Sequence, residues 1–86
     1  MAYTVRLTPG ARSDLEGLDS EVRRRVIAKL GRLAESFDEL NPEPLSADWR
    51  GYYKLRVGDW RVIYKPNRET KTITVYRVAH QREVYL

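Results

Sequence analysis

The chain of 86 residues carries 16 Lys and Arg against 12 Asp and Glu, a net charge of +4 that favours acidic or phosphate-rich partners. This length fits one small domain over residues 1–86, and the lack of cysteine with a single histidine argues against a disulfide framework or a zinc site. No apolar run approaches the roughly 20 residues that span a bilayer and no signal-peptide pattern opens the chain, so we expect a cytoplasmic protein without a membrane partner.

The first segments predict a strand and a short helix. Residues Tyr3 to Leu7 alternate apolar and polar side chains, which is typical of a strand with one buried face. Thr8 before Pro9 is a helix-start signal, because the hydroxyl can cap free amides and Pro is tolerated at the first helical position. An apolar stripe follows at Ala11, Leu15 and Leu18.

A longer amphipathic helix comes next, with Asp19 and Ser20 as candidate N-caps. Its apolar positions recur at three- and four-residue spacing: Val22, Val26, Leu30, Leu33 and Phe37. The opposite face is basic, either solvated or meeting phosphates, through Arg23, Arg24, Arg25, Lys29 and Arg32. Gly31 predicts close packing of this helix against the first one.

The stretch from Asp38 to Asp48 is acidic and rich in proline. Its run Asn41-Pro42-Glu43-Pro44 predicts a helix stop followed by an extended connector. We expect Leu45 and Trp49 to hold this connector against the core.

Residues Tyr52 to Lys65 predict a β-hairpin, because β-branched and aromatic residues alternate with basic ones on both sides of Gly58-Asp59. A two-residue loop with Gly first suits a type II′ turn. The register that follows faces Val57 with Trp60, Leu55 with Val62 and Tyr53 with Tyr64 on the core side.

The other side of the hairpin gathers four cations, Lys54, Arg56, Arg61 and Lys65, and places Arg56 opposite Arg61. Like charges directly opposite in a sheet are destabilising, so the cluster favours a site for an anionic ligand. The alternative is a solvated face with long side chains in water.

After a polar loop over 66–71, Thr72 to Ala79 predicts another strand, and the tail runs from His80 to Leu86. Tyr76 and Val78 facing inward would leave Arg77 free, but Ile73 and Val75 compete for the core side. The predicted order is strand, helix, helix and three antiparallel strands. It indicates an α+β fold, with two helices packed on one face of a small, mainly antiparallel sheet.

The sequence resembles the RelE/ParE superfamily of toxins from bacterial type II toxin–antitoxin pairs, and more the RelE branch. The resemblance spans the whole chain and is carried by the two-helix start, the hairpin Tyr53 to Tyr64 and the ending Val78 to Tyr85. It implies a ribosome-dependent, metal-independent endoribonuclease (an mRNA interferase) that needs no cofactor. Such a toxin cuts mRNA at the decoding site by 2′-hydroxyl attack, inhibits translation, and is silenced by a cognate antitoxin protein.

By this resemblance the catalytic roles fall on Lys54 as base, Arg61 on the scissile phosphate, Arg82 at the leaving oxygen and Tyr85 orienting the substrate. Positive charge on Arg56 and Arg61 would favour the neutral form of Lys54 that a base requires. The leaving-group role stays open between His80 and Arg82, because Gln81 stands where relatives often have Arg. Further RNA contacts are expected from Arg56, Tyr52, Lys65 and Arg77.

Two other functions share this fold. A ParE-like toxin would inhibit DNA gyrase by binding, and a non-catalytic RNA-binding module would use the basic sheet face. In either toxin, we expect the antitoxin to cover Arg56 and Arg61.

Overall fold

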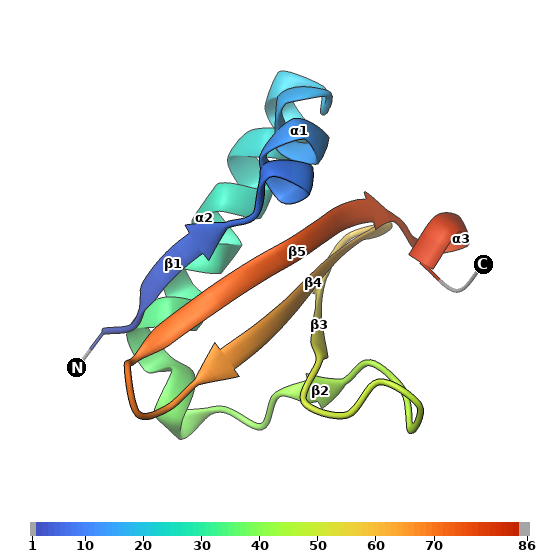
Figure 1. Ribbon diagram of the computed structural model, residues 1–86. Coiled ribbons are helices and arrows are strands. Elements are labelled where there is room, and N and C mark those ends of the chain that lie inside the picture. Colours follow the sequence, from blue (N-terminus) through green and yellow to red (C-terminus); the bar gives the residue numbers. More distant parts are fainter. Residues whose placement is uncertain (1, 85–86) are drawn as a thin grey trace.

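The computed structural model describes residues 2–84 (Figure 1). Its elements are β1 (Thr4–Leu7), α1 (Pro9–Glu16), α2 (Ser20–Ser36), the 3-10 turn η1 (Phe37–Glu39), β2 (Glu43–Pro44), β3 (Tyr53–Val57), β4 (Trp60–Asn67), β5 (Thr72–His80) and α3 (Gln81–Val84). Within residues 2–84 the strands form one sheet in the order β1-β5-β4-β3-β2, in which β1 and β5 pair in parallel and the other neighbours pair antiparallel.

The helices α1 and α2 lie on one face of the sheet, where α1 packs on β5 and α2 packs on β1 and β3. This arrangement confirms the predicted α+β fold of two helices on a mainly antiparallel sheet. Within residues 2–84, none of the helices has the length and apolar character to cross a bilayer. We call the sheet face that points away from α1 and α2 the outer face.

Side-chain caps start α1 and α2 where the sequence predicts. Thr8 Oγ1 accepts a hydrogen bond from the Ala11 amide at 3.1 Å, and Asp19 Oδ2 accepts one from the Glu21 amide at 3.2 Å. The predicted apolar stripes are buried: Ala11 and Leu15 on α1, and Val26, Leu30 and Leu33 on α2. Capping and periodicity therefore position the helical layer.

The hairpin of β3 and β4 has the predicted register. Val57 pairs with Trp60 across the turn, and Arg56 pairs with Arg61. Gly58 has a φ of 58°, which the first loop position of a type II′ turn requires. The turn thus fixes which hairpin side chains enter the core.

Strand β5 combines both patterns that the sequence left open. Ile63 pairs with Arg77 while Tyr64 pairs with Val75, so Tyr76 is an extra residue, a β-bulge. Ile73, Val75 and Val78 enter the core, whereas Tyr76 lies on the outer face, 40% exposed. Predicting Tyr76 inward was therefore wrong, because the bulge interrupts the alternation.

Two expectations for the surface are also wrong. Gly31 is exposed with nothing within 4 Å of the position of a Cβ, so it does not bring the helices closer. Trp49 is 57% exposed and packs edge-to-face on Tyr52 on the outer face, not on the core. The extended connector after α2 is where the sequence predicts it, and it contains η1 and the two-residue strand β2, which pairs with β3 at the edge of the sheet.

Candidate active site

The outer face brings the predicted hairpin cations together. Arg56, Arg61 and Ala79 follow one another across β3, β4 and β5, and the next row holds Lys54, Ile63 and Arg77. Residues two apart on a strand share a face, so these cations occupy one surface of the sheet.

An acidic residue that the sequence did not assign to the site lies among these cations. Glu43 on β2 accepts two hydrogen bonds from the Arg56 guanidinium, both at 2.8 Å, and its carboxylate lies 3.6 Å from Lys54 Nζ. The hydrogen bonds from Arg56 lower the pKa of Glu43 from its usual 4.5 to about 2. The repulsion that the sequence predicts between Arg56 and Arg61 is therefore compensated inside the chain.

Arg61 is held far more tightly than the sequence predicts. Its Nη1 donates to the carbonyl oxygens of Gly58 at 2.8 Å and Trp60 at 2.9 Å, and its Nη2 donates to Gln81 Oε1 at 3.0 Å. A position on the outer face of the hairpin suggests an exposed side chain, yet the residue is only 7% exposed. The turn and the start of α3 close over it, so alternation predicted its face correctly and its exposure wrongly.

The tail places its predicted residues in different surroundings. His80 pairs with Trp60, and their rings meet edge-to-face at 5.5 Å, while His80 Nδ1 accepts a hydrogen bond from the Arg82 amide at 3.2 Å. Trp60 packs against the core, so His80 lies on the helix-facing side of the sheet. The Arg82 side chain is exposed on α3. Tyr85, the predicted substrate-orienting residue, lies outside the described residues.

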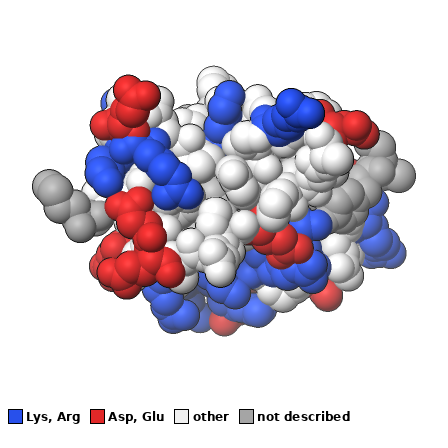
Figure 2. All heavy atoms as spheres, turned by 90° about the horizontal axis from the view of Figure 1, so that it is seen from below, with Lys and Arg blue, Asp and Glu red and all other residues white. Residues whose placement is uncertain are grey.

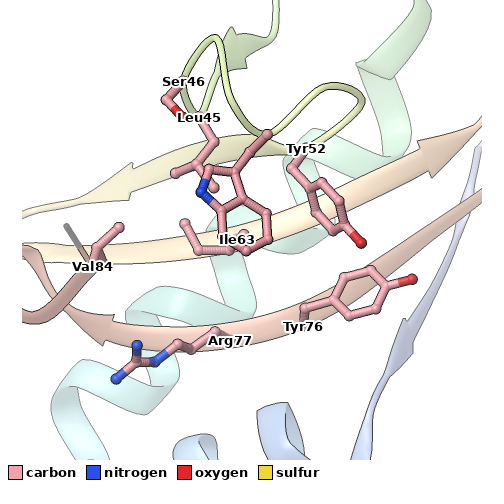
Figure 3. A pocket seen from close by; sticks show the side chains of 8 residues that line it. Leu45, Ser46, Tyr52, Ile63, Tyr76, Arg77 and Val84 are labelled. Carbon is pink, nitrogen blue, oxygen red and sulfur yellow. The ribbon is translucent and has the colours of Figure 1, made fainter. Parts of the chain in front are cut away.

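A hollow of about 520 Å³ lies beside the cations on the outer face (Figure 3). Its walls come from the connector before β3, from β4, β5 and α3: Leu45, Ser46, Trp49, Tyr52, Ile63, Tyr76, Arg77 and Val84. Tyr52 meets Tyr76 edge-to-face at 5.4 Å, and Lys65 Nζ lies 5.4 Å from the Tyr52 ring centre. Of the predicted RNA contacts, Tyr52, Lys65 and Arg77 thus gather here, and Arg56 lies with Glu43.

Sequence reasoning missed Glu43, Gln81 as the partner of Arg61, and the aromatic hollow. The cluster of aromatic residues Trp49, Tyr52 and Tyr53 could have indicated the hollow, but no pattern signals the two-residue strand that carries Glu43.

The charged side chains are clustered on the surface, in addition to giving the chain a net charge of +4. Figure 2 shows basic and acidic side chains gathered in clusters around an uncharged middle of the view from below. Among residues 2–84, no group of three or more His, Asp or Glu side chains could hold a metal ion. What the outer face offers chemically is a fixed guanidinium, an amine and exposed arginines, which suit phosphate oxygens.

Comparison with known proteins adds to this geometry. A family model described as the ParE toxin of the type II toxin-antitoxin system, parDE, matches residues 5–85. The chain is 33% identical over 91 residues to Toxin RelG of Mycobacterium tuberculosis, and the match covers 99% of this chain and 98% of RelG.

Two solved structures are similar over nearly the full length. A chain of the toxin-antitoxin complex RelBE2 from Mycobacterium tuberculosis has a TM-score of 0.82 and 31% identity, covering 93% of this chain and 99% of that chain. A mutant of the E. coli toxin RelE in the free state has a TM-score of 0.78 and 27% identity, covering 99% of this chain and 92% of that chain.

Proposed function

Because the chain belongs to the RelE/ParE superfamily of toxins from type II toxin–antitoxin systems, we propose that it is a ribosome-dependent endoribonuclease that cuts mRNA at the decoding site. The observation that carries this proposal is the buried guanidinium of Arg61, fixed by three hydrogen bonds in one row with Arg56 and next to the row of Lys54. A preorganised cation of this kind stabilises charge that develops on a phosphate.

The reaction needs the ribose 2′-oxygen in line with the phosphorus. The 2′-oxygen attacks and forms a bond to phosphorus, the bond from phosphorus to the 5′-oxygen breaks, and a 2′,3′-cyclic phosphate and a 5′-hydroxyl result. Lys54 takes the 2′-hydroxyl proton in this step, for which its amine must be neutral. Arg61 has five N–H donors, of which the three contacts above use three, and the others bind the phosphoryl oxygens.

The departing 5′-oxygen requires a proton or charge stabilisation. Arg82 is the better candidate, because its side chain is exposed at the end of the strand that carries Arg77 and Ala79 on the outer face. His80 is on the opposite side of the sheet, packed on Trp60. Tyr85 keeps the substrate-orienting role that the family resemblance implies.

The proposal includes a cognate antitoxin as partner in the cytoplasm, supported by the complex in which the RelBE2 toxin was solved. The sequence suggested that the antitoxin covers Arg56 and Arg61. Since Glu43 already pairs with Arg56 and the chain itself buries Arg61, their repulsion no longer supports that contact.

A second candidate is a ParE-like toxin that inhibits DNA gyrase by binding. The family model that matches residues 5–85 carries the ParE description, which is the observation in its favour. The relatives at 27–33% identity are RelE and RelG toxins, and they support the nuclease.

Cleavage of mRNA on programmed ribosomes tests the proposal, with new ends located by primer extension. We expect cuts at the decoding site with the wild type and none with Arg61→Ala, while Arg32→Ala on the exposed face of α2 cuts normally. Circular dichroism confirms that each variant is folded in the assay. If the folded wild type makes no cuts, the nuclease is rejected and inhibition of gyrase supercoiling is measured instead.

A further inference from the structure

We propose that the hollow on the outer face is a nucleobase subsite, which stacks one unpaired base of single-stranded RNA beside Lys54. The inference rests on the proposed function in that this RNA is the nuclease's substrate. It assigns a place to the base, whereas the mechanism above concerns only the phosphate and the ribose.

The floor of the hollow adjoins the row of Lys54. Ile63 forms this floor, 7% exposed, and in the sheet it pairs with Lys54 on one side and Arg77 on the other. A base lying on Ile63 therefore has the amine on one flank and a guanidinium on the other. That places its own sugar and phosphate at the cations.

Aromatic rings form the walls. Four large hydrophobic residues of the described chain are well exposed, and two of them, Trp49 at 57% and Tyr76 at 40%, line this one hollow. Figure 3 shows the Tyr52 and Tyr76 rings next to each other at one end, with Val84 toward the other end. Exposed rings grouped around a hollow mark a binding site more often than chance surface exposure does.

Charge decides between two occupants. An apolar side chain of a protein partner would fill the hollow equally well, but it would bring no counter-charge to Lys65 and Arg77 at the rim. Lys65 lies over the Tyr52 ring, and Arg77 lines the hollow. Rings bordered by cations fit a base with a phosphate on either side, which is how single-stranded nucleic acid is bound.

The bulge in β5 builds this site. Because Tyr76 is an extra residue, Tyr76 and Arg77 both project on the outer face although they are adjacent in sequence. A regular strand would point one of them into the core. The aromatic wall and the neighbouring cation therefore depend on the same local irregularity.

Tryptophan fluorescence tests the proposal. The chain has two tryptophans, so Trp60→Phe leaves Trp49 as the sole reporter. The probe is a single-stranded hexanucleotide with 2′-O-methyl riboses, which lacks the attacking hydroxyl and cannot be cut. Its control is a sugar–phosphate chain of the same length and the same number of phosphates, with abasic sugars. We expect the hexanucleotide to quench the fluorescence of Trp49 and the abasic chain to leave it unchanged. The hexanucleotide should also bind about tenfold tighter than the abasic chain.

Variants locate the contact by fluorescence anisotropy with the labelled hexanucleotide. Trp49→Ala should weaken binding about tenfold and Trp49→Phe much less, since a ring remains. The matched control is Ile27→Ala on α2, where the side chain is 55% exposed and away from the hollow. The subsite is rejected if the hexanucleotide and the abasic chain bind with equal affinity, or if Trp49→Ala binds the hexanucleotide as tightly as wild type does. An apolar segment of a protein partner would then be the better occupant of the hollow.

The outcome is separate from that of the cleavage assay, because neither probe can be cut. Cuts on the ribosome with no base-dependent quenching reject the subsite and keep the nuclease. Quenching without cuts keeps the base site and rejects the nuclease.

Discussion

Replacing Arg61 tests whether its buried guanidinium stabilises the fold. The change Arg61→Ala removes its hydrogen bonds to the carbonyls of Gly58 and Trp60 and to the Gln81 side chain. A hydrogen bond from a charged donor contributes about 1.5–3 kcal/mol when its partner stays dry. Gly58 and Gln81 are exposed, so water replaces part of each lost contact.

We therefore expect the free energy of unfolding to fall by about 2–3 kcal/mol, less than the sum of three such bonds. Urea unfolding followed by circular dichroism at pH 7 measures it. Arg56→Ala is the matched control, since Arg56 lies directly opposite in the sheet but is exposed and paired with Glu43. An exposed pair contributes about 0–1 kcal/mol.

The reasoning fails if Arg61→Ala and Arg56→Ala lower stability equally. It would then follow that the three contacts of Arg61 are no better than a surface ion pair. Such a result would also remove the argument for a preorganised guanidinium, whatever the cleavage assay shows.

Three further predictions concern single contacts. Glu43→Gln should lower the free energy of unfolding above pH 4.5, the usual pKa of the carboxyl group. The difference from wild type should vanish as the pH falls toward 2, because the pKa of Glu43 in the folded protein is about 2 and the carboxylate loses its charge there. A stability difference that stays constant between about pH 5 and pH 2 would contradict this. Leu30→Ala should cost about 2–5 kcal/mol in urea unfolding, as a buried leucine on α2 leaves a cavity, and a negligible change would reject the assigned helix face. Asp14→Ala should cost about 1–3 kcal/mol, because its carboxylate accepts from the Val78 amide at 2.9 Å; faster amide exchange at Val78 checks the cause, and unchanged exchange would refute it.

Local chemistry made much of the fold predictable. The caps at Thr8 and Asp19 involve contacts within three residues, and the Gly58 turn sets the hairpin register by its own backbone. Such signals lie within a few residues of sequence, so no tertiary information is needed to interpret them.

What could not be predicted depends on contacts between distant segments. Arg61 is buried because Gln81, twenty residues later, closes over it, and alternation predicts a face without predicting what covers it. The pairing of Glu43 with Lys54 and Arg56 involves a strand too short to have a period. Of the candidate site, the sequence therefore predicted the cations and missed the acid that balances them.

Because Tyr76 is an extra residue in β5, the outer face of that strand can change without a change in its core face. Without Tyr76, the order Ile73, Val75, Val78 would alternate regularly with Thr74, Arg77 and Ala79, so every core side chain would keep its place. A deletion at this position should therefore yield a folded domain with a shallower, less aromatic outer surface. The strand can gain or lose an aromatic ring on its outer face by insertion or deletion of a single residue, without any repacking of the core beneath it.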